Sequence, residues 1–233
     1  MERLHPFIIV DDLATLVVSR QLAHHLVSVR RLRNGARLFA GDGHGRFRTV
    51  AIEAIQAQVR LVPLSDISIV PRDEPDIGIA MFLPSSERLS WAVQKLTETG
   101  IDRIHLLSDL HDRRGGAQLS PAHLERLERV AREAAQQSER LWLPVIDPPK
   151  PAHEYFASVG QGVAILDPAG GPLPKGVTTL VVGPESGAIV APDSIPRVSL
   201  GLPILRIETA AVAGSILLAT LRASLVCICD KPW

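Results

Sequence analysis

The chain has 233 residues, of which 46% are hydrophobic and 21% charged, and 25 basic residues balance 25 acidic ones. This composition supports one or two domains with a buried core and excludes a chain that is disordered throughout. The most apolar tract, Thr209–Leu221, is too short to cross a bilayer, and no apolar run with a cleavage site follows Met1. Two cysteines are too few for a disulfide framework. We therefore expect a cytoplasmic protein.

Arginine is concentrated near the N-terminus, although the chain as a whole is neutral. Residues 1–60 hold nine arginines against five acidic residues, a net charge of +4, whereas residues 61–233 hold 16 basic and 20 acidic residues, a net charge of −4. Overall neutrality argues against a nucleic-acid partner, but arginine offers planar, forked donors that suit phosphate oxygens and stack on bases. A solvated charged face explains the cluster equally well, so both interpretations stand at this point.

The first 70 residues predict short β-strands. Pro6–Val10 and Thr49–Ile55 are apolar and prone to β-structure. The glycine cluster Gly41–Gly45 separates Arg37–Ala40 from Arg46–Val50 and predicts the turn of a hairpin in a small barrel. The cluster lacks a third spaced glycine, a following helix and a βαβ frame, which excludes a dinucleotide-binding oxidoreductase.

The polar, proline-bounded segment Pro71–Pro75 predicts a linker, so we expect one domain over residues 1–72 and a second over residues 73–233. Beyond the linker, apolar strands alternate with helices, which predicts an α/β domain with a mostly parallel sheet covered on both faces. The expected strands are 77–83, 101–107, 143–146, 163–166, 179–182 and 197–200, and the expected helices are 85–99, 120–140 and 207–226. The last helix is apolar on nearly all sides, so it must be buried within the domain or against a second subunit.

Three strings are candidates for function. Val182–Gly187 follows a strand, where ligands bind in open α/β sheets, although an ordinary strand-to-loop turn also explains it. Val198–Ala210 leads from a strand through a Gly/Pro turn into a helix. There Glu208 suits the helix dipole, whereas Arg206 is unexpected at an apolar junction. Glu133–Arg140 is a polar stripe late in a helix, for which a surface position is the default interpretation.

In this order, and together with Val93–Gly100 and the N-terminal element His24–Arg30, the strings resemble the RsmE-type uridine-N3 methyltransferases of 16S ribosomal RNA in the SPOUT superfamily. The family's Glu-Ala-Ala-x-Gln-Ser-x-Arg phrase matches Glu133–Arg140. Its Gly-Pro-Glu-Gly-Gly phrase becomes Gly183–Gly187, and its Leu-Gly-x-x-Ile-Leu-Arg-x-Glu-Thr-Ala phrase matches Leu200–Ala210. The resemblance spans almost the whole chain and implies a small PUA-like β-barrel followed by a SPOUT-like α/β domain, whose parallel sheet contains a trefoil knot.

The resemblance also implies S-adenosylmethionine as the methyl donor, bound in the knot loops largely by backbone groups and completed across a homodimer interface. The donor-binding residues expected by motif match are Leu166, Gly183, Pro184, Glu185, Gly187, Leu200, Gly201, Ile204, Leu205, Arg206, Thr209 and Ala210. The 16S RNA, free or in the small ribosomal subunit, is expected to contact the N-terminal arginines Arg20, Arg30, Arg31 and Arg33.

Methyl transfer to uracil N3 requires removal of the N3 proton or stabilisation of the imide anion. We expect Arg206 to stabilise the anion or to position the base, and either Glu208 or Glu185 to accept the proton or to act as an orienting group. Because N3 lies on the Watson–Crick edge, the target must be unpaired or flipped out of its helix.

The chain departs from the family's pattern at Ser186, where the family has glycine, and in residues 188–195, which are too few for a connecting helix. The alternative function is therefore a catalytically weak or inactive homologue that binds RNA or assists ribosome assembly. We expect no metal, because the adjacent His24 and His25 point in different directions and have no suitably spaced partners. Cys227 and Cys229 are expected to serve as small apolar side chains in the core rather than in redox chemistry.

Overall fold

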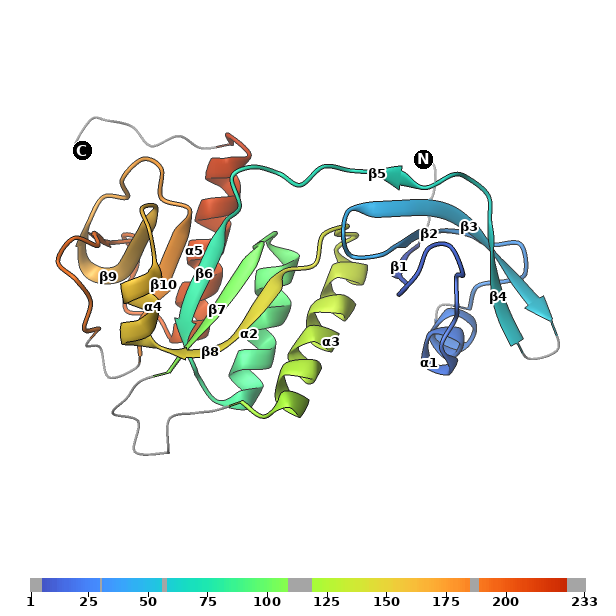
Figure 1. The fold of residues 1–233 in the computed structure, drawn as a ribbon, viewed down its shortest axis with the longest axis horizontal. Helices are drawn as coiled ribbons and strands as arrows, with labels where there is room; N and C mark the ends of the chain where they lie inside the picture. The colour runs from blue at the N-terminus through green and yellow to red at the C-terminus, as the bar shows by residue number, and fades with distance from the viewer. Residues whose placement is uncertain (1–5, 30, 56–57, 109–118, 185–188, 226–233) are drawn as a thin grey trace. The chain divides into compact units, whose positions relative to one another are not determined.

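The structure, a computed structural model, describes residues 6–225 with the exception of residues 30, 56–57, 109–118 and 185–188. The chain divides into two compact units (Figure 1). Unit 1 consists of the chain up to Arg72 together with Ala135–Leu143, and unit 2 consists of Asp73–Ala134 and the chain from Pro144 onward. Residues 135–143, expected in the second domain, belong to unit 1.

Unit 1 is built on a five-stranded sheet. Strand β1 (Phe7–Ile9) pairs in parallel with β2 (Arg37–Gly41), and β2 pairs antiparallel with β3 (Arg46–Ile55). Strand β3 also pairs antiparallel with β4 (Gln58–Pro63) and β5 (Ser68–Ile69). The predicted hairpin between β2 and β3 is confirmed. The buried core of the unit includes Ile8, Leu13, Leu26, Leu38, Val50 and Ile52.

A helical segment in unit 1 was not predicted. Helix α1 (Arg20–His24) continues into a π-helical turn, η1 (His25–Val29). The Ser19 hydroxyl accepts a hydrogen bond from the backbone N–H of Leu22 at 3.1 Å, as an N-cap residue does. Leu26 is completely buried in the core of the unit, so the segment is held in place by its apolar side.

The turn between β2 and β3 packs against the segment 135–143. The backbone N–H of Gly45 donates to the Leu141 carbonyl at 3.1 Å, and the Trp142 indole Nε1 donates to the Val70 carbonyl at 3.1 Å. The guanidinium carbon of Arg72 lies 5.0 Å from the centroid of the same indole ring, a distance typical of a cation–π contact. These contacts leave no room for a side chain at Gly45, where an added Cβ would overlap the Trp142 ring and lie 2.6 Å from the Val70 oxygen.

Gly45→Ala is therefore expected to destabilise unit 1 by about 1–3 kcal/mol, through overpacking against the indole. Gly35→Ala is a matched control, because Gly35 has a φ of +80° against +81° at Gly45 and meets nothing within 4 Å. Both variants carry the same backbone strain, so their difference measures the clash. Urea unfolding followed by tryptophan fluorescence gives the two midpoints, and equal midpoints would contradict close packing of Gly45 against the indole.

Unit 2 contains a six-stranded sheet in which every neighbouring pair is parallel, in the order β11-β9-β10-β6-β7-β8. The predicted parallel sheet is confirmed, and the trefoil knot stays a prediction. The strands are β6 (Gly78–Phe82), β7 (Arg103–Ser108), β8 (Val145–Pro151), β9 (Val163–Gly171), β10 (Thr179–Val182) and β11 (Arg197–Val198).

Helices cover both faces of this sheet (Figure 1). Alternation along β6 sends Ile79 and Met81 to one face and Ala80 and Phe82 to the other. The first face packs against α2 (Ser86–Glu98), α3 (Pro121–Gln137) and α5 (Ile207–Arg222), and the second against the short α4 (Ala152–Ser158), which was not predicted. Across the described residues, no helix combines the length and apolar character needed to span a membrane.

Several predicted element ends in unit 2 were wrong. The helix expected to reach Arg140 ends at Gln137, and Glu139 follows with a φ of +56°, which a helix cannot contain. The helix expected to reach residue 226 ends at Arg222, and Ser224 has a φ of +55°. Strand β8 begins and ends later than expected, β9 extends to Gly171, and β11 is only two residues long.

Candidate functional site

A pocket of about 340 Å³ opens in unit 2 beside the middle of β9, at the end of β10 and along the segment that leads from β11 into α5. This is the carboxyl edge of the sheet, the usual place for ligands in parallel α/β folds. Seven of the predicted donor-binding residues line it: Leu166, Gly183, Pro184, Leu200, Ile204, Leu205 and Ala210. They come from three separate segments of the chain, and the fold brings them around one cavity.

The other predicted donor-binding residues do not line the pocket or cannot be placed. Among the described residues, Gly201, Arg206 and Thr209 are exposed and lie outside the lining. Gly201 has a φ of +67°, which suits glycine, so the backbone conformation of this turn explains why a glycine stands at this motif position. Glu185 and Gly187 lie outside the residues that the structure describes.

One wall of the pocket carries an ion pair that was not predicted. A guanidinium nitrogen of Arg197, Nη1, lies 3.0 Å from Oδ2 of Asp167, and Nη2 donates to the carbonyl of Ile189 at 3.0 Å. The backbone N–H of Ala169 donates to Oδ1 of Asp167 at 2.9 Å. The Ala169 hydrogen bond, and after it the one from Arg197, lower the pKa of Asp167 below its usual value, so the carboxylate is ionised at neutral pH.

A second ion pair that was not predicted lies at the start of α5. Arg206 is the N-cap residue of this helix, and its side chain makes no capping hydrogen bond. Two residues on, Glu208 is buried, and its Oε2 lies 3.5 Å from Nη1 of Arg88 in the first turn of α2. Within the described part of the chain this oxygen accepts no hydrogen bond, so the contact with Arg88 is an ion pair without hydrogen-bond geometry.

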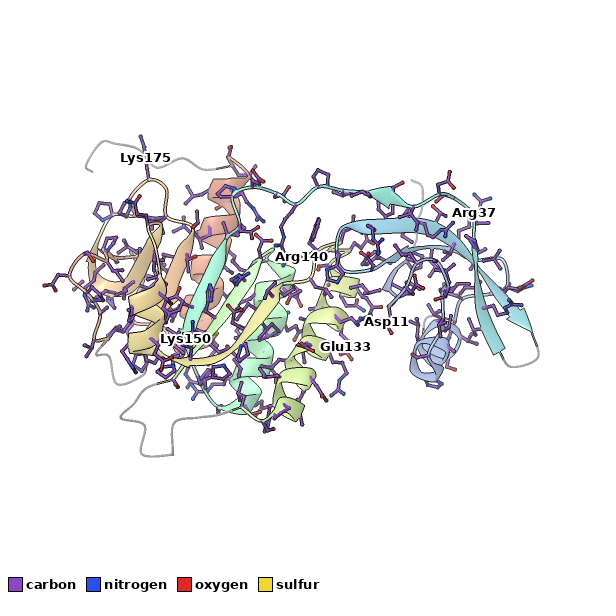
Figure 2. All side chains as sticks on the ribbon, in the orientation of Figure 1. Asp11, Arg37, Glu133, Arg140, Lys150 and Lys175 are labelled. Carbon is purple, nitrogen blue, oxygen red and sulfur yellow. The ribbon has the colours of Figure 1, made fainter. Side chains whose placement is uncertain are left out.

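The Glu133–Arg140 string lies partly in unit 1 and has a structural role there. Oε1 of Gln136 accepts a hydrogen bond from the backbone N–H of Ile9 at 3.0 Å, and Ala135 is completely buried against the β1 side chains. Figure 2 shows Glu133 on α3 and Arg140 in the loop that follows. Because Glu133 is exposed while Ala135 and Gln136 are not, the string is more than a surface stripe.

The arginines predicted to bind RNA lie around the helical segment of unit 1. Arg20 is the first residue of α1, whereas Arg30 lies outside the described residues. Arg31 and Arg33 follow η1 and are exposed, as is Arg37 at the start of β2 (Figure 2). Exposed arginines of this kind are free to approach an RNA backbone.

No metal-binding cluster is found in the described ranges, where no three His, Cys, Asp or Glu side chains come together in a way that could hold an ion. Cys227 and Cys229 lie outside those ranges.

Comparison with known proteins identifies the two parts of the chain. A family model described as an RNA methyltransferase domain matches residues 72–219, and one described as an RNA methyltransferase PUA domain matches residues 18–62. The chain is 32% identical over 230 residues to the ribosomal RNA small subunit methyltransferase E of Mycobacterium bovis, covering 88% of this chain and 86% of that protein.

Further similar proteins carry the same name. The Bacillus subtilis protein is 26% identical over 230 residues, covering 86% of this chain and 88% of its own. The crystal structure of the Neisseria gonorrhoeae protein, bound to S-adenosyl methionine, superposes with a TM-score of 0.77 at 20% identity, covering 93% of this chain and 98% of that one. At that identity the superposition establishes a shared fold.

Proposed function

This chain belongs to the RsmE-type family of small-subunit ribosomal RNA methyltransferases, and we propose that it transfers a methyl group from S-adenosylmethionine to N3 of a uridine in 16S ribosomal RNA. The observation that supports this proposal most directly is the pocket at the carboxyl edge of the sheet, around which seven donor-binding residues expected from the family motifs gather. Its location in an RNA methyltransferase domain, next to an RNA methyltransferase PUA domain in the sequence, fits an RNA substrate.

The pocket fits the donor in its chemistry. Its lining is mostly apolar and includes Leu166, Leu200 and Ile204, which suit an adenine ring. Gly183 and Pro184 present backbone rather than long side chains, and the two charged residues on one wall can meet polar atoms of the ligand. When bound, the donor supplies an electrophilic methyl group, and the chain's own residues hold the acceptor and manage its proton.

We propose that Arg206 stabilises the negative charge on the uracil. It is exposed between the lining residues Leu205 and Ile207, so its guanidinium can reach a base outside the donor pocket. The N3 proton goes to a carboxylate as the N3–carbon bond forms and the sulfur–carbon bond breaks. Glu208 and Glu185 are the two candidate acceptors, and the ion pair with Arg88 holds Glu208 at the start of α5. Comparing E208Q with E185Q in pH–rate profiles decides which one titrates.

Exposed apolar side chains in the pocket lining support a homodimer. Ile204 and Leu202 line the pocket and are 87% and 50% exposed, and Val190, next to the lining residue Ile189, is 88% exposed. Exposed apolar side chains of this size favour association. We propose that a second copy covers Leu202 and Ile204 and thereby closes the donor pocket, and that the enzyme works in the cytoplasm, where its RNA is found. Sedimentation velocity that detects only monomer at micromolar concentration would contradict this arrangement.

Filling the pocket is expected to weaken donor binding. Ala210 lines the cavity from α5, so Ala210→Phe should raise the Kd for S-adenosylmethionine about 10- to 100-fold in isothermal titration. The same change at Ala122, an exposed position early in α3, should leave the Kd unaltered. If the two variants bind the donor equally well, the pocket is not the donor site.

Activity itself is tested by incubating the enzyme with donor and small ribosomal subunits that lack the modification, followed by mass mapping of the 16S RNA. A new methyl group at uracil N3 supports the enzyme. Donor binding or RNA binding without any methyl transfer would instead favour the alternative, a homologue that acts in RNA binding or ribosome assembly.

A further inference from the structure

The pocket wall contains a charged pair that none of the motifs accounts for. Among the described residues that line the cavity, Asp167 and Arg197 are the only charged ones. Side-chain exposure is 27% for Asp167 and 44% for Arg197, so the pair is open to the cavity rather than hidden behind it. A carboxylate in an otherwise apolar lining is costly to desolvate unless it is hydrogen-bonded, so its partners decide what can bind beside it.

The backbone holds this carboxylate in a fixed place. Strand β11 pairs with β9 at Arg197 and Ile165 and next at Val198 and Gly171, so that residues 166–170 bulge out of the pairing with β11. Gly170 permits this bulge, since an added Cβ would lie 2.5 Å from the backbone nitrogen of Val198. Within the bulge, the Ala169 N–H holds Oδ1 of Asp167.

Arg197 connects three segments that line the pocket. It belongs to β11, it binds Oδ2 of Asp167 in the bulged part of β9, and it donates to the carbonyl of Ile189, which follows β10. Ile189 is itself buried in the core on the α4 face. The guanidinium therefore fixes the carboxylate with respect to the other walls.

The carboxylate retains hydrogen-bonding capacity for a ligand. Each of its oxygens has two lone pairs, and among the described residues each accepts from one donor, the Ala169 N–H for Oδ1 and Arg197 for Oδ2. A ligand ammonium group is a poor candidate, because the guanidinium 3.0 Å from Oδ2 would repel it. A neutral hydroxyl has no such repulsion, and an acidic side chain is the partner of a ribose hydroxyl in dinucleotide-binding α/β folds.

We propose that Asp167 accepts a hydrogen bond from a ribose hydroxyl of the methyl donor, and that Arg197 is the positioning residue that holds Asp167 for this contact. The inference rests on the proposed function, since it requires a nucleoside ligand in this pocket. It gives the pocket a polar specificity element in addition to its apolar walls.

The test compares ligands that differ by one hydroxyl. S-adenosylhomocysteine and its 2′-deoxy and 3′-deoxy derivatives are titrated calorimetrically into the wild type and into Asp167→Ala. In the wild type, loss of the contacted hydroxyl should weaken binding about 10- to 100-fold, the range for a hydrogen bond to a charged group. In Asp167→Ala the parent and deoxy ligands should bind within about twofold of each other. Because each ratio is measured on one preparation, a partly unfolded variant does not distort it.

Arg197 is tested by the same ratio. In Arg197→Ala the penalty for the missing hydroxyl should shrink, and in the double variant it should fall to the value found in Asp167→Ala alone. A purely structural role would weaken all ligands equally and leave the ratio at its wild-type value, which would overturn the positioning assignment.

The possible failures are distinguishable. If S-adenosylhomocysteine does not bind the wild type, both the proposed function and this inference fail. If it binds and the deoxy penalty is unchanged in Asp167→Ala, only the ribose contact is overturned. A further ligand, 5′-methylthioadenosine, lacks the amino-acid portion. If it binds the wild type more weakly than S-adenosylhomocysteine but binds Asp167→Ala equally well, the carboxylate binds the ammonium group and the ribose assignment is wrong.

Discussion

Asp102→Ala is expected to lower the free energy of unfolding of unit 2 by about 3–5 kcal/mol, the range for removing one partner of a buried ion pair. Asp102 is buried with 3% exposure, and its Oδ2 accepts hydrogen bonds from the Arg222 guanidinium and, at 3.0 Å, from the backbone N–H of Ile77. Arg222 also donates to the Gly100 carbonyl at 3.1 Å. The pair joins the last residue of α5 to the segments that precede β6 and β7.

The size of the effect follows from what is left behind. Without Asp102 the Arg222 side chain, 11% exposed, loses its closest countercharge in a largely dry environment. Replacing both partners, as in Asp102→Ala with Arg222→Met, should therefore destabilise the protein less than the sum of the two single changes.

Glu98→Ala is the matched comparison for this prediction. Glu98 pairs with Lys95 on the surface of α2, with side chains 30% and 33% exposed, and an exposed pair of this kind contributes about 0–1 kcal/mol. Urea unfolding followed by far-UV circular dichroism compares the variants. A loss of stability in Asp102→Ala no larger than that in Glu98→Ala would show that the buried pair does not hold the end of α5.

The elements of unit 2 were predictable wherever burial left a clear pattern. The apolar run over β6 and the periodicity of α2 both come from packing against the sheet, so hydrophobic patterning located them within one or two residues. The ends of α3 and β9 depend on single backbone conformations, such as the positive φ of Glu139 and the bulge before Gly171, which composition does not encode.

The helical segment of unit 1 illustrates a signal that was present but not used. Ser19 is a good N-cap residue and Leu26 a buried anchor, yet a short π-helical turn has no clear periodicity. Within the candidate site, motif matching found the apolar and glycine positions, whereas Asp167, Arg197 and Arg88 were missed. Their contacts join residues 30 and 120 positions apart in the chain, and only the folded backbone brings them together.

Arg206→Ala is expected to lower kcat for methyl transfer about 100- to 1,000-fold while changing the donor Kd by less than about threefold. Arg206 is exposed at the N-cap of α5 and lies outside the pocket lining, although its neighbours Leu205 and Ile207 belong to it. Its guanidinium is therefore placed to act on the uracil rather than on the donor. Removal of the N3 proton leaves negative charge on the uracil oxygens, and a nearby cation stabilises that charge.

The pH dependence separates this role from simple loss of structure. A guanidinium that stabilises the imide anion lowers the pKa of the bound uracil, so the wild-type rate should reach its plateau at a lower pH than the rate of Arg206→Ala. Arg206→Lys retains the charge and should recover part of the activity, whereas Arg129→Ala, at an exposed position on α3, should behave as wild type. If the donor Kd of Arg206→Ala instead rises by the same factor as kcat falls, Arg206 serves the donor, and the charge on the uracil must be met by another residue.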